Sequence, residues 1–310
     1  MTVTSRPAAG LADLRAAGEV LTRAWLDGAP FVNATPGDLS WWFAQAWPSE
    51  LAERLRIWTA DDRVVAWSWE DGSEFDSCVW SGDPELDDAV ARAALARAID
   101  AATTRARTGG DGAVQLWAAD DDVRTLGRLR AFGFAPAPRV ATRHGALSQF
   151  QRTVDDPATM PHRPLPDGYR IRSLSGPAEL AARVDVHRAA FAPSRMSVGK
   201  YERLIALPAY RVEDDLVVEA PDGSLAAFAM AWWDPLAGIG ELEPVGTHPD
   251  HQRLGLGAAL LSHALARYAS FGARLVQVFS DAENVASEAL YQSVGFRRRA
   301  YHRPYRRPAS

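Results

Sequence analysis

The chain has 310 residues, of which 47% are hydrophobic and 24% charged, and its formal net charge is −5 at pH 7. This length predicts about two domains, and the negative charge argues against a nucleic-acid-binding protein. Residues 1–20 lack the apolar run of a signal peptide or a membrane span. A single cysteine, Cys78, excludes an internal disulfide, and the seven histidines show no ligand-like spacing, so no metal site is expected. We therefore expect a cytoplasmic monomer or homodimer without nucleic-acid or membrane partners.

The first half of the chain, residues 1–150, alternates helical and extended patterns. Hydrophobic periodicity predicts helices at 11–26 and 86–107, a helical region within 39–54, and strands at 55–59, 64–69, 76–80 and 113–117. Four acidic residues lie at the start of the long helix: Asp83, Glu85, Asp87 and Asp88. Because their carboxylates would occupy the positive end of the helix dipole, we expect them to repel a phosphate group there.

Residues 151–167 are rich in proline and aspartate, as linkers are, which predicts a domain boundary there. The second half, residues 168–310, continues with the same kind of alternation. It predicts strands at 169–172, 216–219, 225–233 and 240–247, and helices at 177–191 and 198–207. Trp232 and Trp233, near the end of one of these strands, could line an acceptor site or belong to the core.

A glycine-rich turn, Gln252-Arg253-Leu254-Gly255-Leu256-Gly257, follows the strand at 240–247 and opens a helix that ends near Gly272. Such a turn leaves the first amides of the helix unpaired at the positive end of its dipole, and the glycines let a phosphate approach. A P-loop is excluded because Ala258-Ala259 stands where Lys-Ser or Lys-Thr is needed. A dinucleotide fingerprint is disfavoured because Leu260 occupies the place of its third small residue. We expect the turn to bind a pyrophosphate.

This turn resembles the Q/R-x-x-G-x-G/A signature of the GCN5-related N-acetyltransferases (GNAT), with Gln252, Gly255 and Gly257 in the required places. A second motif follows the strand-like run 275–280. Residues 284–296 resemble the family's N-x-x-[SA]-x-x-L-Y-x-x-x-G-F segment. Two motifs in the right order and on the expected elements predict an α/β (α+β) fold with two tandem GNAT-like domains. The resemblance implies that each is a mixed, mostly antiparallel twisted sheet flanked by helices.

The resemblance also implies acetyl-CoA as the co-substrate and assigns residues to it. Backbone amides of the strand would pair with the pantetheine arm and polarise the thioester, the turn would bind the pyrophosphate, and two polar residues of the second motif would contact the pantetheine or merely cap their helix. These residues are Val245, Gly246, Thr247, Gln252, Arg253, Leu254, Gly255, Leu256, Gly257, Ala258, Asn284 and Ser287.

Acyl transfer from a thioester to an ammonium requires a base for the amine and benefits from an acid for the thiolate. Glu241 lies eleven residues before Gln252, the offset at which histone-type members of the family carry their base. Glu243 points to the same face of the strand and remains a substitute. Tyr291 falls on the family's tyrosine position and is the candidate acid. The alternatives are a solvated strand carboxylate for Glu241 and a core aromatic for Tyr291.

The first half repeats part of this pattern without its chemistry. Aligning Gly133 with Gly295 (295 − 133 = 162) places Leu129 at the position of Tyr291 and Asp122 at that of Asn284. We therefore predict that residues 1–150 form a degenerate GNAT-like domain without a phosphate-binding loop and that residues 168–310 form the catalytic domain. An unrelated α/β domain is the alternative for the first half.

The sequence thus predicts an acetyl-CoA-dependent N-acetyltransferase acting on a primary amine of a small molecule. The alternative is a non-catalytic CoA-binding or regulatory module. A narrower resemblance, carried by the G-E-x-x-x-V-G-x-x-P pattern at residues 240–249, is to mycothiol synthases, which acetylate the cysteinyl amine of a glucosaminyl-inositol conjugate; Pro244 breaks the strand pattern there. For the arginine-rich segment 297–307 the resemblance implies a final hairpin beside the acceptor channel, which could attract an acidic acceptor or be a solvated face.

Overall fold

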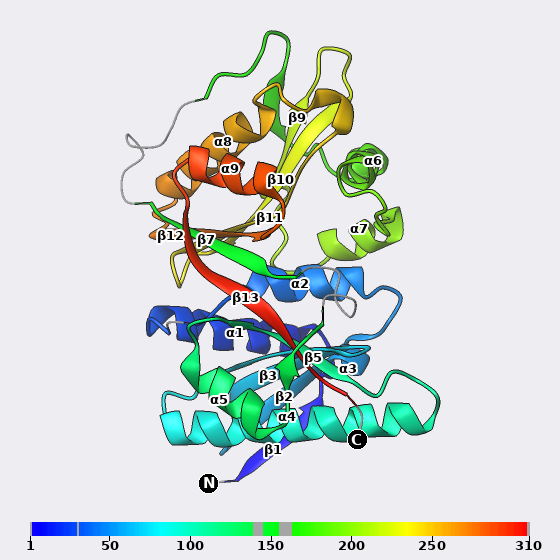
Figure 1. Ribbon diagram of the computed structural model, residues 1–310. Helices are drawn as coiled ribbons and strands as arrows, with labels where there is room; N and C mark the ends of the chain where they lie inside the picture. Colours follow the sequence, from blue (N-terminus) through cyan, green and yellow to red (C-terminus); the bar gives the residue numbers. More distant parts are fainter. Residues whose placement is uncertain (1, 30, 139–144, 155–162, 309–310) are drawn as a thin grey trace.

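The computed structural model describes residues 2–29, 31–138, 145–154 and 163–308. Within these residues thirteen strands form one sheet with helices on both faces (Figure 1). Its strands pair in the order β1-β2-β3-β4-β5-β13-β7-β12-β11-β10-β9-β8, and β6 pairs with β13. Neighbouring strands are antiparallel except for β4–β5 and β11–β12, which are parallel. The predicted fold class, a mostly antiparallel α/β arrangement, is confirmed.

The elements of the first half follow the predicted order, with one helix divided. They are β1 (Val3–Pro7), α1 (Leu11–Leu26), α2 (Pro36–Gln45), α3 (Leu51–Arg54), β2 (Leu55–Ala60), β3 (Arg63–Asp71), β4 (Glu74–Val79), α4 (Pro84–Arg107), β5 (Val114–Ala119), α5 (Val123–Ala131), β6 (Ala135–Pro136) and β7 (Leu147–Thr153). The helical region predicted within 39–54 is confirmed and consists of two helices. Pro48 lacks an amide proton and disfavours helical geometry at the residue before it, so α2 ends at Gln45 and α3 begins at Leu51.

The second half contains the elements expected after the linker. They are β8 (Arg170–Ser173), the 3₁₀ turn η3 (Pro177–Glu179), α6 (Leu180–Ala190), α7 (Val198–Ile205), η4 (Val212–Asp214), β9 (Asp215–Glu219), β10 (Leu225–Asp234), β11 (Ile239–Thr247), η5 (Pro249–His251), α8 (Leu256–Ser270), β12 (Leu275–Asp281), α9 (Val285–Ser293) and β13 (Arg297–Arg307). No helix in the described part of the chain is long and apolar enough to cross a membrane.

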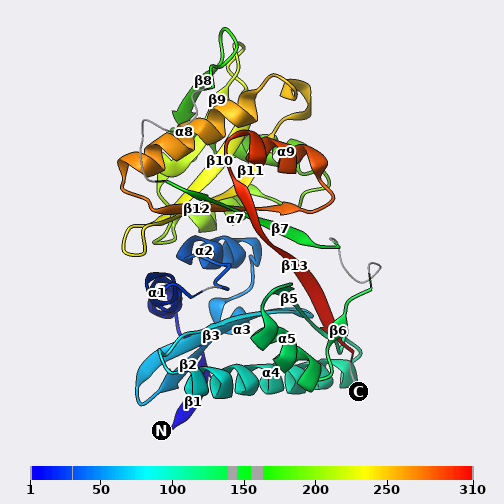
Figure 2. The ribbon, with the colours of Figure 1, turned by 60° about the vertical axis from the view of Figure 1, so that its left-hand side comes forward.

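Two strands are exchanged between the halves. β7 leaves the first half and lies between β12 and the start of β13, whereas the end of β13 pairs with β5 of the first half (Figures 1 and 2). Residues 151–153 of the predicted linker therefore belong to β7, and residues 155–162 lie outside the described part. The expected final hairpin is wrong, because residues 297–307 form one long strand that continues into the other half. The division into domains stays a prediction. The sheet continues across it, because β7 pairs with β12 of the second half and the end of β13 pairs with β5 of the first.

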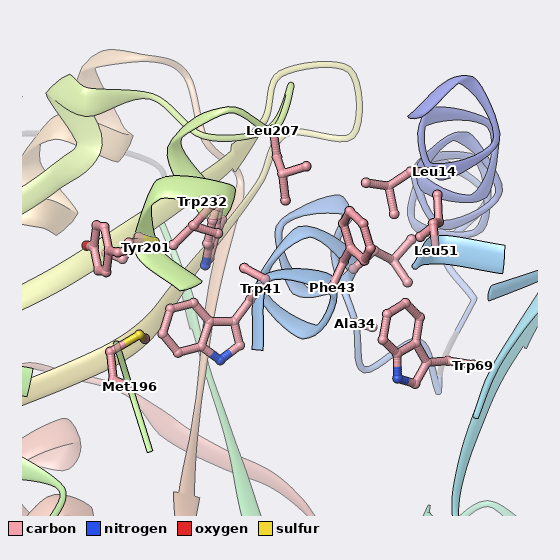
Figure 3. Close-up of a cluster of buried hydrophobic side chains, with 14 of the residues drawn as sticks. Leu14, Ala34, Trp41, Phe43, Leu51, Trp69, Met196, Tyr201, Leu207 and Trp232 are labelled. Carbon is pink, nitrogen blue, oxygen red and sulfur yellow. The ribbon is translucent and has the colours of Figure 1, made fainter. Parts of the chain in front are cut away.

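The two halves also share a hydrophobic core. Helices α1 and α2 of the first half pack with β10, α6 and α7 of the second in one cluster (Figure 3). Its side chains include Leu14, Trp41, Phe43, Trp69, Met196, Tyr201, Leu207 and Trp232. Separate clusters lie under α8 and α9 and under α4 and α5. The N-terminus of α2 is thereby fixed against β10 and β11, next to the residues predicted to be catalytic.

Candidate functional site

The site begins where β11 and β12 separate. The two strands pair over three positions, 239–241 with 275–277, and the described residues beyond them form no further pairs. A register shift against β10, between the pairs Ala231↔Leu242 and Ala229↔Val245, leaves Glu243 and Pro244 in a bulge at this point. Bulges bend a strand and re-aim its side chains. The bulge thus turns β11 away from β12 directly after Glu241.

The glycine-rich turn leads from this opening into α8. Gly255 is the N-cap at φ 77°, a left-handed conformation that favours glycine, and no side chain caps the helix. A Cβ at Gly257 would lie 3.1 Å from Leu290 Cδ2, so glycine permits close packing of α8 on α9. The first turn of α8 contains no acidic residue. Its unpaired amides and dipole therefore suit an anion, as expected for a pyrophosphate site.

The remaining turn residues lie along the same surface. Arg253 has a φ of 65°, and Leu254 is exposed. The Gln252 side-chain amide donates to the Thr247 carbonyl at 3.5 Å, a long hydrogen bond that joins the turn to the end of β11. The structure thus brings the predicted turn residues and residues 245–247 together at one end of the opening. Their role in holding the co-substrate stays a prediction.

The predicted base Glu241 is fully buried and held by two donors. Its carboxylate accepts hydrogen bonds from Thr35 Oγ1 at 2.7 Å and from Gln277 Nε2 at 3.1 Å. Thr35 and Asp38 form the capping box at the start of α2, where Asp38 Oδ2 accepts from the Thr35 amide at 2.6 Å. Carboxylate oxygens of Asp38, Glu241 and Glu243 all lie within 4.8 Å of one another. The first half therefore contributes a carboxylate to this group.

Sequence analysis missed Thr35 and Asp38. The T-x-x-D spacing signals a helix start, but nothing in the sequence places that start beside a strand more than two hundred residues away. The packing that places it there is close: a Cβ at Gly37 would lie 2.3 Å from Trp232 Cγ. Trp232 is accordingly a core residue, and its indole Nε1 donates to the Glu243 carbonyl at 2.7 Å.

The three carboxyl groups hold their protons more tightly than free side chains do. Burial, followed by the nearby Asp38, raises the pKa of Glu241 well above its usual value, and burial also raises the pKa of Asp38. Burial and Asp38 raise the pKa of Glu243 to about 8. Glu241 is enclosed by its hydrogen-bond donors, whereas Glu243 is only partly buried and has no side-chain partner among the described residues. Glu243 is therefore the more accessible proton acceptor of the pair.

A chain of buried side chains leads from Glu241 into the exchanged strands. Gln277, which donates to Glu241, accepts from Gln149 Nε2 at 3.0 Å, and Gln149 Oε1 lies 3.1 Å from His302 Nε2. Gln149 and His302 come from β7 and β13, so this network spans the two strands that join the halves. Such a network fixes the orientation of the Glu241 carboxylate because each amide has defined donors and acceptors.

Tyr291 lies on α9, buried against Phe150 and Phe296 at ring-centroid distances of 5.8 and 6.1 Å. Its hydroxyl has no hydrogen-bond partner among the described residues. Burial and the nearby Glu243 raise its pKa, so the phenol is protonated throughout the neutral range and can act only as a proton donor. Tyr291 is thus both packed in the core and free at its polar tip.

Asn284 caps α9, which is the alternative to a pantetheine contact in the sequence prediction. Its Oδ1 accepts a hydrogen bond from the Ser287 amide at 3.1 Å. Ser287 Oγ in turn donates to the Asn284 carbonyl at 3.0 Å and contacts Ser280 Oγ. Asn284 is exposed, and Ser287 is half-buried. Capping occupies the Asn284 oxygen and leaves its amide nitrogen for a ligand.

Three of the six arginines of the closing segment are paired with acidic residues, which come from both halves. Arg298 contacts Glu288 at 2.6 Å, Arg299 contacts Asp121 at 2.7 Å and Arg306 contacts Asp111 at 2.9 Å. These ion pairs offset the local positive charge. They weaken the suggestion that this segment attracts an acidic acceptor.

Comparisons with known proteins agree with this geometry. The model of the acetyltransferase (GNAT) family matches residues 186–296, which contain the bulged strand, the turn and both motif helices. A mycothiol acetyltransferase of Thermomonospora curvata is 31% identical over 211 residues, covering 65% of this chain and 70% of the relative. The chain belongs to the GNAT acetyltransferase family. Members of this family are acyl-transferring enzymes.

Two further comparisons bear on the extent of the likeness. A tandem GNAT protein from the clavulanic acid biosynthesis pathway matches with a TM-score of 0.67 at 15% identity. The match covers 100% of this chain and 99% of that protein. This similarity shows that the tandem fold is shared. A mycothiol acetyltransferase of Paenarthrobacter aurescens is 30% identical over 192 residues, which cover 56% of this chain and 58% of the relative. The match thus spans less than two thirds of that relative's length.

The first half contains a counterpart of the site. β4 and β5 pair at Glu74↔Gln115, and Gln115 Nε2 donates to Glu74 at 2.6 Å, as Gln277 does to Glu241 (277 − 115 = 162). Asp76, two residues after Glu74, occupies the place of Glu243, and burial raises its pKa to about 7. The first half thus keeps the opening between its strands and two carboxylates at it.

Proposed function

We propose that the second half transfers an acetyl group from acetyl-CoA to a primary amine of a small molecule. The observation that carries the proposal is the grouping of the carboxyl oxygens of Asp38, Glu241 and Glu243 within 4.8 Å of one another where β11 and β12 separate, on the strand that leads to the uncapped start of α8. Three close carboxyl groups that share too few counter-charges attract an ammonium.

The residues present fit acetyl-CoA at the other end of the opening. The start of α8 has neither a side-chain cap nor an acidic residue, and Gly255 leaves open space beside the turn, since a Cβ there would have no atom within 4 Å. Acetyl-CoA supplies the thioester. Residues 252–258 would bind its pyrophosphate, and the backbone of Val245, Gly246 and Thr247 would bind the pantetheine arm.

Within this proposal Glu243, the substitute in the sequence prediction, is the proton acceptor, and Glu241 is its buried partner. Glu243 is partly accessible, and its pKa of about 8 lies between that of an ordinary carboxyl and that of an ammonium. Glu241 holds the cluster together through Thr35 and Gln277. After Glu243 takes a proton from the ammonium, the neutral amine attacks the thioester carbonyl.

Tyr291 completes the reaction by donating its phenolic proton to the departing thiolate. Burial raises its pKa, so the phenol carries this proton throughout the neutral range. The proton that the amine nitrogen loses as the amide forms restores the phenol. After burial, the charge of Glu243 raises the pKa of Tyr291, so the two groups are close enough to interact. The base and the acid are therefore two groups of one site.

The acceptor is a separate part of the proposal. The first acceptor to assay is the cysteinyl amine of a glucosaminyl-inositol conjugate, because relatives of this chain are named mycothiol acetyltransferase. Simple alkyl amines, an aromatic amine and peptide N-termini complete the panel. Release of free thiol from acetyl-CoA measures transfer with each amine. We expect release with at least one primary amine. Measurable CoA binding without thiol release from any amine would favour a non-catalytic CoA-binding module instead.

A further inference from the structure

A cavity of about 330 Å³ lies in the first half, where β4 and β5 separate after their single pair Glu74↔Gln115. Its wall comes from β4, β5, α4 and α5, from the segment between α1 and α2, and from β13. Five aromatic side chains line it: Phe31, Trp67, Phe75, Trp80 and Trp117. A volume of this size holds a small organic molecule, and the aromatic wall excludes an occupant that is polar throughout.

Polar groups in the wall lack partners. Trp67 Nε1 and His302 Nδ1 are buried without a hydrogen-bond partner among the described residues, and Trp67 and His302 are 1% and 3% exposed. Buried polar atoms of this kind are rare in proteins because each one costs free energy. An indole N–H can only donate, so a ligand that satisfies Trp67 carries a hydrogen-bond acceptor.

Asp76 supplies a carboxylate to the same wall. It accepts from the Ser77 amide at 2.7 Å, and no lysine or arginine of the described residues contacts it. The other carboxylates of the wall are already engaged: Asp87 accepts from Ser81, and Asp122 caps α5. Asp87 is held by an amide and a hydroxyl, and Asp122 lies at the positive end of α5, so Asp76 is the carboxylate of the wall that remains for a cationic ligand.

The basic groups of the wall are placed away from Asp76. Arg128 is bound to Asp88 at 3.0 Å, and Arg124 is exposed on α5. Burial lowers the pKa of His302 to about 4, so its imidazole is neutral. Burial, with Asp38 and Glu74 nearby, raises the pKa of Asp76 to about 7, which agrees with a carboxyl group that lacks a cation.

A coenzyme does not fit the outer end of this cavity. Asp83 caps α4 and accepts from the amides of Glu85 and Leu86 at 2.9 and 3.3 Å, so the groups that would hold a pyrophosphate are occupied. The carboxylates of Glu85 and Asp87 in the first turn repel a phosphate further. The cavity is thus closed to the ligand that suits its counterpart in the second half.

We propose that this cavity binds a cation that carries an aromatic ring and an alkyl ammonium group. The ammonium lies on Asp76, and the ring lies among the aromatic side chains. A carboxylate satisfies the ammonium, and aromatic faces attract a cation that is removed from water. A hydroxyl on the ring would accept from Trp67. This inference concerns the first half alone and does not depend on the activity proposed for the second.

Three probes with one ring separate the contributions. Tyramine carries a phenol and an ammonium, tyrosol replaces the ammonium by a neutral hydroxyl, and 4-hydroxyphenylpropionate carries a carboxylate. Each is titrated into the full chain by calorimetry in the presence of CoA, which cannot donate an acetyl group. We expect tyramine to bind at least about tenfold more tightly than tyrosol, because tyrosol lacks the ammonium that contacts Asp76. We expect the carboxylate probe not to bind, because Asp76 repels it.

Matched variants assign the binding to one half. Asp76→Asn keeps the shape of the side chain and removes its charge, and we expect it to weaken tyramine at least about tenfold while tyrosol is unaffected. Asp100→Asn, the same change at an exposed carboxyl of α4 outside the cavity wall, should leave this tyramine isotherm unchanged. Glu243→Gln removes a carboxylate of the ammonium site proposed for the second half, so tyramine binding that survives this change belongs to the first half. Val79→Phe, which adds a ring to the cavity wall, should abolish binding of both compounds; circular dichroism verifies that each variant is folded.

Three outcomes would overturn the proposal. Tyrosol that binds as tightly as tyramine makes the cavity a site for neutral aromatic molecules. Loss of tyramine binding in Glu243→Gln but not in Asp76→Asn places the amine in the second half. No heat or intrinsic tryptophan fluorescence change with tyramine at millimolar concentration shows that the cavity does not bind this cation.

Discussion

The two halves of the chain place the same kind of helix start at the same point of the sheet, with opposite charge. In the second half α8 begins at Gly255 without a side-chain cap, so its amides are available to an anion. In the first half α4 begins at Asp83, whose carboxylate already accepts from two amides. The openings between the strands and the Gln–Glu pairs below them are retained in both. We therefore expect cofactor binding in this fold to depend on a few residues at one helix start rather than on the sheet.

The halves differ again at the position of the acid. Tyr291 has Leu129 as its counterpart, and both are buried between their helix and the sheet. The aromatic ring and the leucine fill equivalent space, so packing alone does not explain the phenol. The difference is a hydroxyl group that is present in the second half and missing in the first. We expect substitutions of Glu243, Tyr291 and Gly255 to affect catalysis or co-substrate binding. Substitutions of Asp76 and Leu129, the counterparts of the first two, should not.

The largest effect is expected at Glu243. Glu243→Gln removes the proton acceptor, so we expect kcat to fall by roughly 10²–10⁴-fold with an alkyl amine. Its counterpart Asp76→Asn should keep the parental kcat. In the parent enzyme kcat/KM should fall as the pH is lowered below about 8, since the protonated carboxyl cannot accept a proton. In the variant the rate should instead rise steadily with pH toward the pKa of the amine, because only the neutral fraction of the amine then reacts. Steady-state rates of thiol release across pH 6–9 measure both.

The same experiment decides between the two glutamates. An aromatic amine that is neutral at the assay pH should be much less sensitive to Glu243→Gln, because it needs no base. Glu241→Gln keeps the hydrogen bond to Thr35 possible and should cost less than Glu243→Gln. A larger loss in Glu241→Gln, with restoration at high pH, would make Glu241 the base and Glu243 the spectator.

Tyr291→Phe should have the next largest effect. It removes only the donor to the thiolate, and because a thiol of pKa about 8.5 is a fair leaving group we expect kcat to fall by roughly 10–100-fold. Affinity for acetyl-CoA should stay at the parental value. Leu129→Met, a volume-conserving change at the counterpart position, should alter neither quantity. Unchanged turnover in Tyr291→Phe would reduce the tyrosine to a packing residue.

Changing the charge at the start of α8 should imitate the first half. Aspartate and asparagine both tolerate the left-handed conformation of Gly255, so they differ in charge alone. Gly255→Asp should weaken acetyl-CoA by at least about tenfold relative to Gly255→Asn, because its carboxylate lies where the pyrophosphate binds. Calorimetry should also give one acetyl-CoA per chain. Equal affinities of the two variants, or two equivalents per chain, would contradict the contrast between the halves.

The sequence predicted the parts of the site that lie on one element and missed those that the fold brings together. The turn at 252–257 and the helix of Tyr291 follow from glycine spacing and periodicity, which are local properties. The exchange of β7 and β13 does not, because both strands have ordinary strand patterns whichever half they join. Asp38 was missed for the same reason: its capping box is a local signal, but its distance to Glu241 depends on the shared core around Trp232.

The smallest effect concerns stability and compares the counterpart carboxyls themselves. The folded-state pKa of Asp76 is about 7 against an ordinary value of 3.8, so the folded chain holds this proton more tightly than the unfolded chain. The resulting stability is present below the unfolded pKa and is lost as the pH rises through 7. In Asp76→Asn this position cannot titrate. Between pH 5 and pH 8 the free energy of unfolding of the parent should therefore fall by roughly 1–2 kcal/mol more than that of the variant. This figure allows for solvent screening of the partly exposed carboxyl. Urea denaturation at the two pH values measures this difference. Glu243→Gln should likewise lose less free energy of unfolding than the parent over this range, because burial also raises the pKa of Glu243. A parent chain that loses no more stability than Asp76→Asn over this range would show that Asp76 is already paired with a cation, which would also remove the charge imbalance on which its proposed ligand depends.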